Sequence, residues 1–519
     1  MLDSYLSSTL AFLAFLFIFV IGLGAAAVVV LFLVDVCQSK DAIRRNYPVV
    51  GRFRYLFIKL GEFFRQYFFA MDREEMPFNR AQRQWVYRAS TALDNTSAFG
   101  STMNTLASGT IVFVNCPFPS LDQDLAASTP TIIGPGCRHP YTASSFFNIS
   151  GMSYGALSAP AVRALSRGAK IAQCWLNTGE GGVSSYHVEG GCDLVFQIGT
   201  AKFGVRDAEG NLSDDKLREV AAHEQVRMFE IKLSQGAKPG KGGILPAAKI
   251  TDEIARIRNI TPGQDVISPN RHIDIDSVGD LLNSIHHIRE VTGKPVGFKS
   301  VIGSVSWLEA LCQEILRRGI DSAPDFITLD SGDGGSGAAP MALMDNTGLS
   351  IRESLPLLAN LLKEYQLKDR IRLIASGKLI TAAEVGWALA AGADFVNNGR
   401  GFMFALGCIQ AMRCNKNTCP TGVTTHNPRL QRALDPADKS VRVANYAFNM
   451  CRDVEIIAHS CGVPEPRRLR PYHVRIMQAD GRSIPLNELY PSSDPADHDP
   501  VKAAEAARNA AQAIVPGQL

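Results

Sequence analysis

Hydrophobic residues run without interruption near the start of this chain. The stretch Thr9–Val34 contains no charged side chain, and as a helix it is long enough to cross the roughly 30 Å of bilayer hydrocarbon. Basic residues follow it at Lys40, Arg44, Arg45, Arg52, Arg54 and Lys59. The positive-inside rule then predicts a single-pass anchor in the inner (cytoplasmic) membrane. Residues 1–8 would lie outside the cytoplasm, and everything after the anchor would lie inside it.

A cleaved signal peptide is the alternative for this first segment. It is disfavoured because MLDSYLSS contains no Lys or Arg, the apolar run is too long, and no small-residue cleavage site follows. Residues 35–126 form a basic and aromatic juxtamembrane and linker region. Within it, RFRYLFIKLGEFFRQYFFAMDR fits either an amphipathic helix on the inner leaflet or a helix packed on the main domain.

From about Ala127 onward, short apolar runs alternate with segments of helical period, which is typical of parallel βα units. Eight strands are expected, at Phe147–Met152, Cys174–Asn177, Val195–Ile198, Met228–Leu233, Val296–Lys299, Phe326–Leu329, Arg372–Ala375 and Asp394–Asn397. Helices are expected between most of them, at Ala159–Ala172, Ser277–Thr292, Trp307–Arg318, Ser350–Tyr365 and Ala382–Ala391. The pattern predicts an α/β fold, a (β/α)8 TIM barrel over residues 127–475.

Polar residues follow the ends of these strands, where a barrel of this class carries its active site. They are Ser153, Glu180, Gln197, Lys232, Lys299, Asp330, Ser376 and Gly399. Three Gly-rich turns, DSGDGGSGAAP, ASGKL and NNGRGF, follow the last three strands. Loops after strands seven and eight usually bind phosphate, because glycine lets backbone N–H groups approach the oxygens. A phosphorylated cofactor is therefore expected, although such turns also occur without a ligand.

Lys299 ends the apolar strand PVGFK and favours FMN over a phosphate ligand without redox chemistry. A cation near the N1/C2 carbonyl edge of a flavin stabilises the reduced ring, whereas a lysine that merely extends from the strand end is the alternative. The residues expected to hold FMN are Met152, Ser153, Asn177, Gln197, Lys299, Ser331, Gly334, Gly335, Ser376, Gly377, Gly399 and Arg400.

Three cysteines, Cys408, Cys414 and Cys419, lie close together in GCIQAMRCNKNTCPTG. Thiolates at such spacing, with a proline after the last one, favour an iron–sulfur cluster, and three ligands indicate a [3Fe–4S] cluster. A structural zinc site with a distant fourth ligand, or three packed thiols, are the alternatives. The eleven cysteines do not resemble a secreted disulfide framework.

Composition adds two limits. A net charge of +3 gives no support for nucleic-acid binding, and 46% hydrophobic residues suffice for one barrel-sized core. Residues 476–519 form a polar, Ala-rich tail, in which DPADHDPVKAAEAARNAAQ is expected to be a loose helix or disordered.

Several motifs together resemble the FMN-binding synthase domain of glutamate synthase, over about residues 134–463. They are GMSYGALS, NTGEGG, QIGTAKFGV, IKLSQGAKPGKGG, ISPNRHIDIDSVGDL, GDGGSGAAP and CNKNTCPTGVTT. The resemblance implies a barrel that holds FMN beside a three-cysteine [3Fe–4S] cluster. It also implies that 2-oxoglutarate and ammonia form 2-iminoglutarate, which reduced FMN converts to L-glutamate.

The resemblance also assigns roles to individual residues. Glu180 matches the active-site glutamate of the family, and Lys232 and Lys238 match lysines that hold 2-oxoglutarate, with Lys238 also a catalytic candidate. Arg258 matches an arginine that pairs with a substrate carboxylate. These roles are physically reasonable because a dianionic oxoacid needs guanidinium and ammonium partners, and a glutamate can move protons during imine formation.

The chain also departs from the family. Ile244 replaces a glutamine placed against the oxoacid, and Lys241 stands where glutamate is common. The glutaminase cysteine, the C-terminal β-helix and a dinucleotide fingerprint are not found. Free ammonia or an amine is therefore the expected nitrogen source, and ferredoxin or a reductase subunit is the expected electron donor. Two other functions remain open: an enzyme like N-methylglutamate synthase, and a membrane-tethered electron-transfer module.

Overall fold

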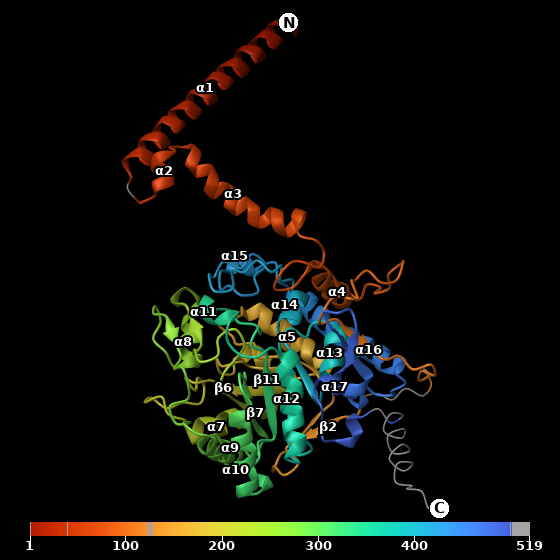
Figure 1. Cartoon of the computed structure of the whole chain (residues 1–519). Coiled ribbons are helices and arrows are strands. Elements are labelled where there is room, and N and C mark those ends of the chain that lie inside the picture. Colours follow the sequence, from red (N-terminus) through yellow and green to blue (C-terminus); the bar gives the residue numbers. More distant parts are fainter. Residues whose placement is uncertain (1, 39, 122, 124–127, 499, 501–519) are drawn as a thin grey trace, which may run out of the picture. The chain divides into compact units, whose positions relative to one another are not determined.

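The computed structural model describes residues 2–38, 40–121, 123, 128–498 and 500 (Figure 1). The chain divides into two units, residues 1–81 and residues 82–519. Of the expected tail, residues 499 and 501–519 lie outside the described residues.

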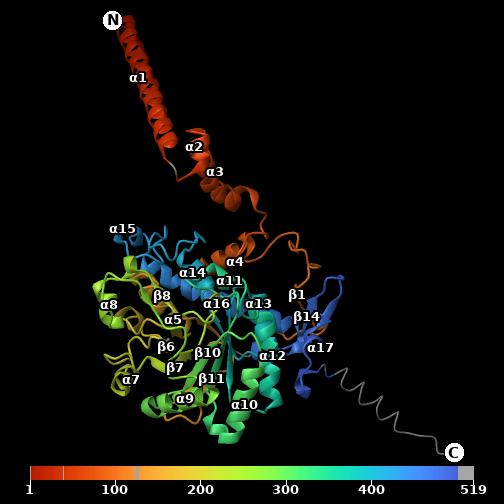
Figure 2. The same ribbon diagram turned by 60° about the vertical axis from the view of Figure 1, so that its left-hand side comes forward.

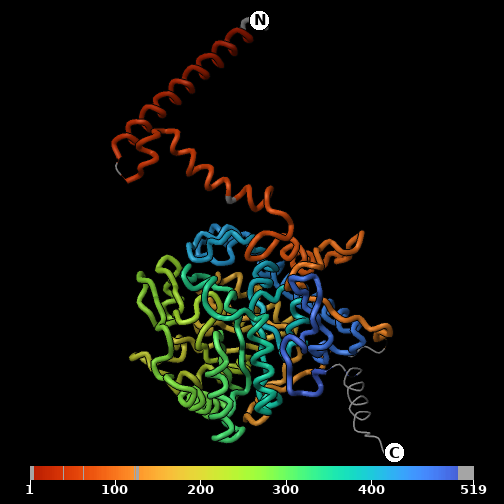
Figure 3. Tube along the Cα trace, in the orientation of Figure 1, coloured from red at the N-terminus to blue at the C-terminus, as the bar shows by residue number. Residues whose placement is uncertain are grey.

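The first unit is helical. Its longest element is α1 (Leu2–Cys37), which extends beyond both ends of the expected Thr9–Val34 segment. Two further helices, α2 (Ala42–Asn46) and α3 (Val50–Phe64), follow it, and a short π-helical turn, η1 (Arg65–Phe69), continues α3. Figure 3 shows α1 and α3 as two arms that meet near α2. The expected juxtamembrane helix therefore forms.

The second unit is built around a closed barrel of eight strands in which all neighbouring pairs are parallel. Going round the barrel the strands are β4 (Phe147–Ile149), β5 (Leu176–Asn177), β6 (Leu194–Ile198), β7 (Val226–Lys232), β10 (Val296–Ser300), β11 (Phe326–Asp330), β12 (Arg372–Ser376) and β13 (Phe395–Asn398). All eight lie where the alternation of apolar runs places them. The (β/α)8 fold class is confirmed.

Helices cover the outside of the barrel (Figure 2). They include the five expected from the sequence, α5 (Ala159–Ala172), α9 (Val278–Thr292), α10 (Ser306–Arg318), α12 (Ile351–Glu364) and α13 (Ala382–Ala390). The C-terminal α16 (Pro436–Ser460) packs on α5. The contact is close: a Cβ on Gly168 would lie 2.5 Å from Val443, so only glycine fits there.

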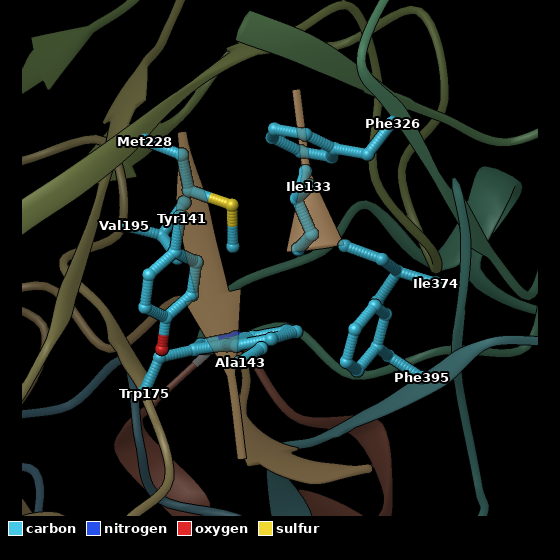
Figure 4. Packing of buried hydrophobic residues seen from close by; sticks show 9 residues of the cluster. All are labelled: Ile133, Tyr141, Ala143, Trp175, Val195, Met228, Phe326, Ile374 and Phe395. Carbon is cyan, nitrogen blue, oxygen red and sulfur yellow. The ribbon is translucent and has the colours of Figure 1, made fainter. Parts of the chain in front are cut away.

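A hairpin that the sequence analysis did not predict closes one end of the barrel. Its strands are β2 (Thr131–Ile133) and β3 (Tyr141–Ala143). Ile133, Tyr141 and Ala143 pack against residues from the beginnings of the barrel strands, among them Met228, Phe326 and Phe395 (Figure 4). The N-terminal end of the barrel is thus filled with apolar side chains, and a ligand site is confined to the opposite end.

In addition to the β2–β3 hairpin, two small sheets in the described residues lie outside the barrel. One joins β1 (Ile111–Phe113) to β14 (Val474–Met477) and β15 (Ser483–Pro485), and the other joins β8 (Ile244–Leu245) to β9 (Val266–Ile267). The first sheet lies partly within the expected tail, so residues 476–490 continue in regular structure, with α17 (Leu486–Leu489) after β15.

The remaining helices of this unit are short connectors. They are α4 (Arg80–Ser90), α6 (Ser185–Val188), α7 (Asp214–Ala221), α8 (Asp252–Arg258), α11 (Met341–Met344), α14 (Arg400–Leu406) and α15 (Pro428–Gln431).

Candidate active site

One carboxylate and three cations meet at the C-terminal end of the barrel. Glu180 follows β5, and Lys232 is the last residue of β7; their side chains form an ion pair of 2.7 Å. Burial opposes the charge of Glu180, but Lys232, Lys238 and Arg258 together hold its pKa below the usual value. Glu180 is thus an ionised base at neutral pH.

Glycines make room for the Glu180 side chain. A Cβ on Gly199 would lie 2.6 Å from Glu180 Cβ, and a Cβ on Gly243 would lie 2.1 Å from Glu180 Oε1. Both distances are shorter than any carbon contact allows. The glycines of QIGT and GKGG therefore shape the pocket around this carboxylate.

Arg258 ends α8 and is buried against the same cluster. One of its terminal nitrogens donates to the Tyr154 carbonyl at 3.0 Å, and its guanidinium lies 5.3 Å from the centre of the Phe203 ring. Burial lowers the pKa of Arg258 to about 10, an effect that Glu180 opposes. Its buried Nε has no hydrogen-bond partner within the described part of the chain.

Lys238 is more easily deprotonated than Arg258. Burial, and then repulsion from Lys232, lower its pKa to about 8, while Glu180 acts in the opposite direction. With the charges of Lys232 and Arg258, the cluster carries more positive than negative charge. Such a cluster suits a ligand with two carboxylates.

A buried glutamate that the sequence analysis missed lies deeper in the barrel. Glu230 on β7 accepts hydrogen bonds from Asn177 Nδ2 at 2.8 Å, Gln197 Nε2 at 2.5 Å and Thr328 Oγ1 at 2.6 Å. It therefore fixes the amide orientations of two residues expected to bind the cofactor. An isolated Glu within the apolar run MFEIK was the signal that could have revealed it, because an unpaired carboxylate is rarely buried.

Lys299 is not isolated, as its strand context suggested, but paired with Asp330. The two side chains are 3.0 Å apart, on the neighbouring strands β10 and β11. Burial opposes the charge of Lys299, yet Asp330 and then Glu230 raise its pKa. Asp330 also accepts from the Gly236 N–H at 3.0 Å. Lys299 is therefore a permanently charged cation in the barrel interior.

The Gly-rich turns after the last strands come together at this end. A Cβ on Gly377 would lie 2.3 Å from Ser331 Cβ, and a Cβ on Gly335 would lie 3.1 Å from Arg400 Nε. Arg400 Nη2 reaches the Asp333 carbonyl at 3.3 Å. Gly334 and Ser376 belong to the same turns. The turns after β11 and β12 are thus packed closely against each other, with the Arg400 guanidinium beside them.

The loop after β4 joins the same assembly. A Cβ on Gly179 would lie 2.7 Å from the Ser153 nitrogen, and a Cβ on Gly399 would lie 3.3 Å from Met152 Cε. The Met152 carbonyl is 2.9 Å from His187 Nε2. Burial lowers the pKa of His187 to about 4, so this histidine is neutral and acts as a fixed support.

The three cysteines share one loop after α14. In the described ranges no group of three or more His, Cys, Asp or Glu side chains is arranged to hold a metal ion. Burial raises the pKa of Cys408 to about 11; the Gln410 N–H opposes this rise, and the charges of Cys414 and Cys419 add to it. The three thiols thus act on one another. The cluster stays a prediction from the sequence.

The cysteine loop is attached to the active-site loops. The buried Lys249 donates to the Ala156 carbonyl at 2.5 Å and to the Cys414 carbonyl at 3.3 Å. Asn417 Nδ2 donates to the Ala248 carbonyl at 2.6 Å. The segment that carries Lys249 leads directly into α8 and Arg258, so the cysteine loop and the cation cluster are mechanically connected.

Ile244 and Lys241 lie in the loop that follows Lys238. Ile244 begins β8 and pairs with Ile267 of β9, directly after Gly243 beside Glu180. The Lys241 N–H donates to the Lys238 carbonyl at 3.2 Å. Both residues in which the chain departs from the expected motif are therefore close in sequence to the cluster, and both are half-buried.

Comparison with known proteins gives a consistent family. The family described as the conserved region in glutamate synthase matches residues 120–464. The "glutamate synthase large subunit-like protein YerD" of Bacillus subtilis is 37% identical over 513 residues, covering 91% of this chain and 97% of that protein. The "archaeal glutamate synthase [NADPH]" of Methanocaldococcus jannaschii is 34% identical over 342 residues, 66% of this chain but only 62% of the archaeal protein.

Among solved structures, a mutant flavocytochrome b2 with benzoylformate aligns over 84% of this chain and 85% of its own. The sequence identity is 14% and the TM-score is 0.46.

Proposed function

Because the chain belongs to the family defined by the conserved region of glutamate synthase, we propose that it is an FMN-dependent oxidoreductase that makes L-glutamate from 2-oxoglutarate and ammonia. The observation that carries the proposal is the cluster of Glu180 with Lys232, Lys238 and Arg258 at the open end of the barrel. This cluster offers cations for two carboxylates and a base beside them.

The chain's own residues account for binding and proton movement. The cations hold the two carboxylates of the oxoacid, and the unpartnered Nε of Arg258 gains an acceptor. Ammonia adds to the keto carbon, and loss of water gives 2-iminoglutarate. Two protons pass from the nitrogen to the oxygen, which leaves as water: Glu180 takes them from the nitrogen in turn, and Lys238, whose pKa is about 8, delivers them to the oxygen.

FMN fits the rest of the site and, when bound in its reduced form, supplies the hydride that converts the imine to L-glutamate. The turns that contain Gly334, Gly377 and Gly399 would hold its phosphate, as their glycine content and their place after the last barrel strands suggest, and Arg400 would contribute positive charge. Lys299 is the cation for the flavin ring. Asn177 and Gln197 are the polar partners that Glu230 orients.

Two further parts of the proposal concern electrons and location. Cys408, Cys414 and Cys419 are proposed to hold a [3Fe–4S] cluster, which supplies one-electron chemistry, and the support is their spacing. A donor protein such as ferredoxin or a reductase subunit would provide the electrons. Helix α1 is proposed as a membrane anchor, because among the described helices it alone is long and apolar enough to cross a bilayer, and the basic residues after it favour a cytoplasmic barrel.

The proposal is tested by product analysis. The full chain, purified in detergent, is incubated anaerobically with a chemical reductant, 2-oxoglutarate and ¹⁵N-ammonium. Formation of ¹⁵N-glutamate supports it, and absence of product with ammonium but formation of an N-methylated product with methylamine would favour the amine-transfer alternative. The Ile244→Gln variant is assayed in parallel, and tighter 2-oxoglutarate binding is expected there because glutamine restores a hydrogen bond.

A further inference from the structure

We propose that α3 and η1 form a second membrane-binding element, which lies along the bilayer surface and is seated in the lipid headgroup region. This inference rests on the proposed anchoring role of α1. The ligand is a phospholipid surface, and the binding face is made of side chains on α3 and η1, all within residues 1–81.

The first observation is the distribution of side chains around α3. Apolar residues recur at the three- and four-residue spacing that puts them on one face of a helix, and each is exposed. They are Phe53 (50% exposed), Leu56 (48%), Phe57 (64%), Leu60 (38%), Phe63 (52%) and Phe64 (40%). Arg52, Arg54 and Lys59 fall outside this face. An apolar face of this size that no other described part of residues 1–81 covers requires a partner.

The π-helical turn η1 extends the same face. In a π-helix, each backbone hydrogen bond joins residues five apart in the sequence, so side chains at that spacing come into contact. The ring centres of Phe63 and Phe68 are 6.1 Å apart, as are those of Phe64 and Phe69. Phe68 and Phe69 are 66% and 74% exposed. The irregular turn therefore keeps the aromatic surface continuous past the end of α3.

The second observation is the attachment of α3 to the end of α1. Asp35, in the last turn of α1, is fully buried and binds both Arg44 Nη2 and Arg52 Nη2 at 2.7 Å. It also accepts the Val49 N–H at 3.1 Å. Asp41 adds a bond of 2.6 Å from Tyr55 Oη. These contacts fix the first turn of α3 beside the last turn of α1, so α3 begins at the depth where α1 leaves the hydrocarbon.

Charge selects a surface position rather than a second span. Helix α3 carries Arg52, Arg54 and Lys59 within its 15 residues, and Arg65 begins η1; charged side chains at the centre of a bilayer are costly. Between residues 40 and 65 there are seven Lys or Arg and two acidic residues. A helix with basic and aromatic faces of this kind binds at the interface, and more tightly to anionic lipid.

The test uses tryptophan as a depth reporter, since the four native tryptophans, Trp85, Trp175, Trp307 and Trp387, all lie outside residues 1–81. The full chain is placed in nanodiscs, with either ordinary or brominated lipid, as Phe57→Trp, Ile58→Trp or Phe17→Trp. Ile58 is 51% exposed and points away from the apolar face, which makes it the matched control. The emission of the parent protein is subtracted.

The expected result is a blue-shifted added emission for Phe57→Trp that brominated lipid quenches strongly, with a red-shifted and weakly quenched emission for Ile58→Trp. Quenching of Phe17→Trp alone would overturn this inference and leave the anchor in place. If neither Phe17→Trp nor Phe57→Trp is quenched, the anchor itself is wrong. Equal quenching at Phe57 and Ile58 would also contradict a seated amphipathic face.

Discussion

At the scale of single residues, the proposed chemistry depends on how securely each cation keeps its proton. Arg258 has a pKa of about 10 and Lys238 one of about 8, both lowered first by burial. At neutral pH both are charged, but Lys238 is the first to become neutral as the pH rises. The carboxylate of Glu180, with its lowered pKa, stays ionised throughout this range.

The first prediction is a pH dependence of oxoacid binding. Protonated Lys238 binds a carboxylate and neutral Lys238 does not, so affinity for 2-oxoglutarate should be full well below pH 8 and fall as the pH rises through about 8. In Lys238→Arg the fall should move to higher pH, because arginine keeps its charge. Titration of the flavin absorbance with 2-oxoglutarate measures this without the pH effect on ammonia. An unchanged profile in Lys238→Arg would show that another group titrates.

The second prediction concerns the two cations directly. Lys238→Ala and Arg258→Ala should each lower kcat/KM roughly 30- to 150-fold, or about 2–3 kcal/mol, as expected for a lost bond between charged groups in a buried pocket. Lys241→Ala, in the same loop, is the matched control and should change kcat/KM little. FMN content should remain the same in all three. A loss of equal size in Lys241→Ala would mean that the loop, not the cations, is responsible.

The third prediction separates the structural role of Glu230 from its charge. Glu230→Ala leaves the buried amides of Asn177 and Gln197 without an acceptor, which should lower the free energy of unfolding by roughly 2–5 kcal/mol. Glu230→Gln keeps an acceptor and should cost less stability. It also removes a negative charge that acts on Lys299, so the flavin reduction potential should rise. Equal stability of the two variants, or an unchanged potential in Glu230→Gln, would contradict this role.

At the scale of elements, the alternating strands and helices of the barrel were predictable, whereas the strands outside the barrel were not. The eight strands follow from local apolar runs, and α5 has the expected bounds Ala159–Ala172. The hairpin β2–β3 and the β1–β14 pairing were both missed. The second joins Ile111 to Ile476, and no local signal reports a contact so distant in sequence. Glu180 comes from the loop after β5, Lys232 from the end of β7 and Arg258 from the end of α8, and only the family motifs brought them together before the structure did.

The fourth prediction belongs to the cysteine loop. Cys414→Ser should abolish iron binding while FMN stays bound, because the loop and the phosphate turns use different residues. Cys37→Ser, an exposed cysteine in α1, is the control and should retain iron. Iron and flavin contents, with the electron paramagnetic resonance spectrum, are the readouts. Zinc in place of iron, or iron unaffected by Cys414→Ser, would reject the cluster.

At the scale of the whole molecule, the chain combines a helical unit, residues 1–81, with a second unit that is built around a barrel. The barrel class was predictable because eight apolar strands with intervening helices admit few other arrangements. The contacts inside the barrel were less predictable. The Lys299–Asp330 ion pair and the hydrogen bonds of Glu230 depend on which side chains the neighbouring strands bring together. The ion pairs of Asp35 with Arg44 and Arg52 were equally unpredictable, because in the sequence the two arginines are only part of a basic cluster.

We propose that this barrel transfers electrons from bound flavin to 2-iminoglutarate. The most direct measurement is reoxidation of the chemically reduced, purified full chain under strictly anaerobic conditions, followed by flavin absorbance. Addition of 2-oxoglutarate together with ammonium should restore the oxidised flavin spectrum, whereas either compound alone should not. A flavin that stays reduced with both compounds, in a protein shown to contain FMN, would contradict the proposed electron transfer to 2-iminoglutarate.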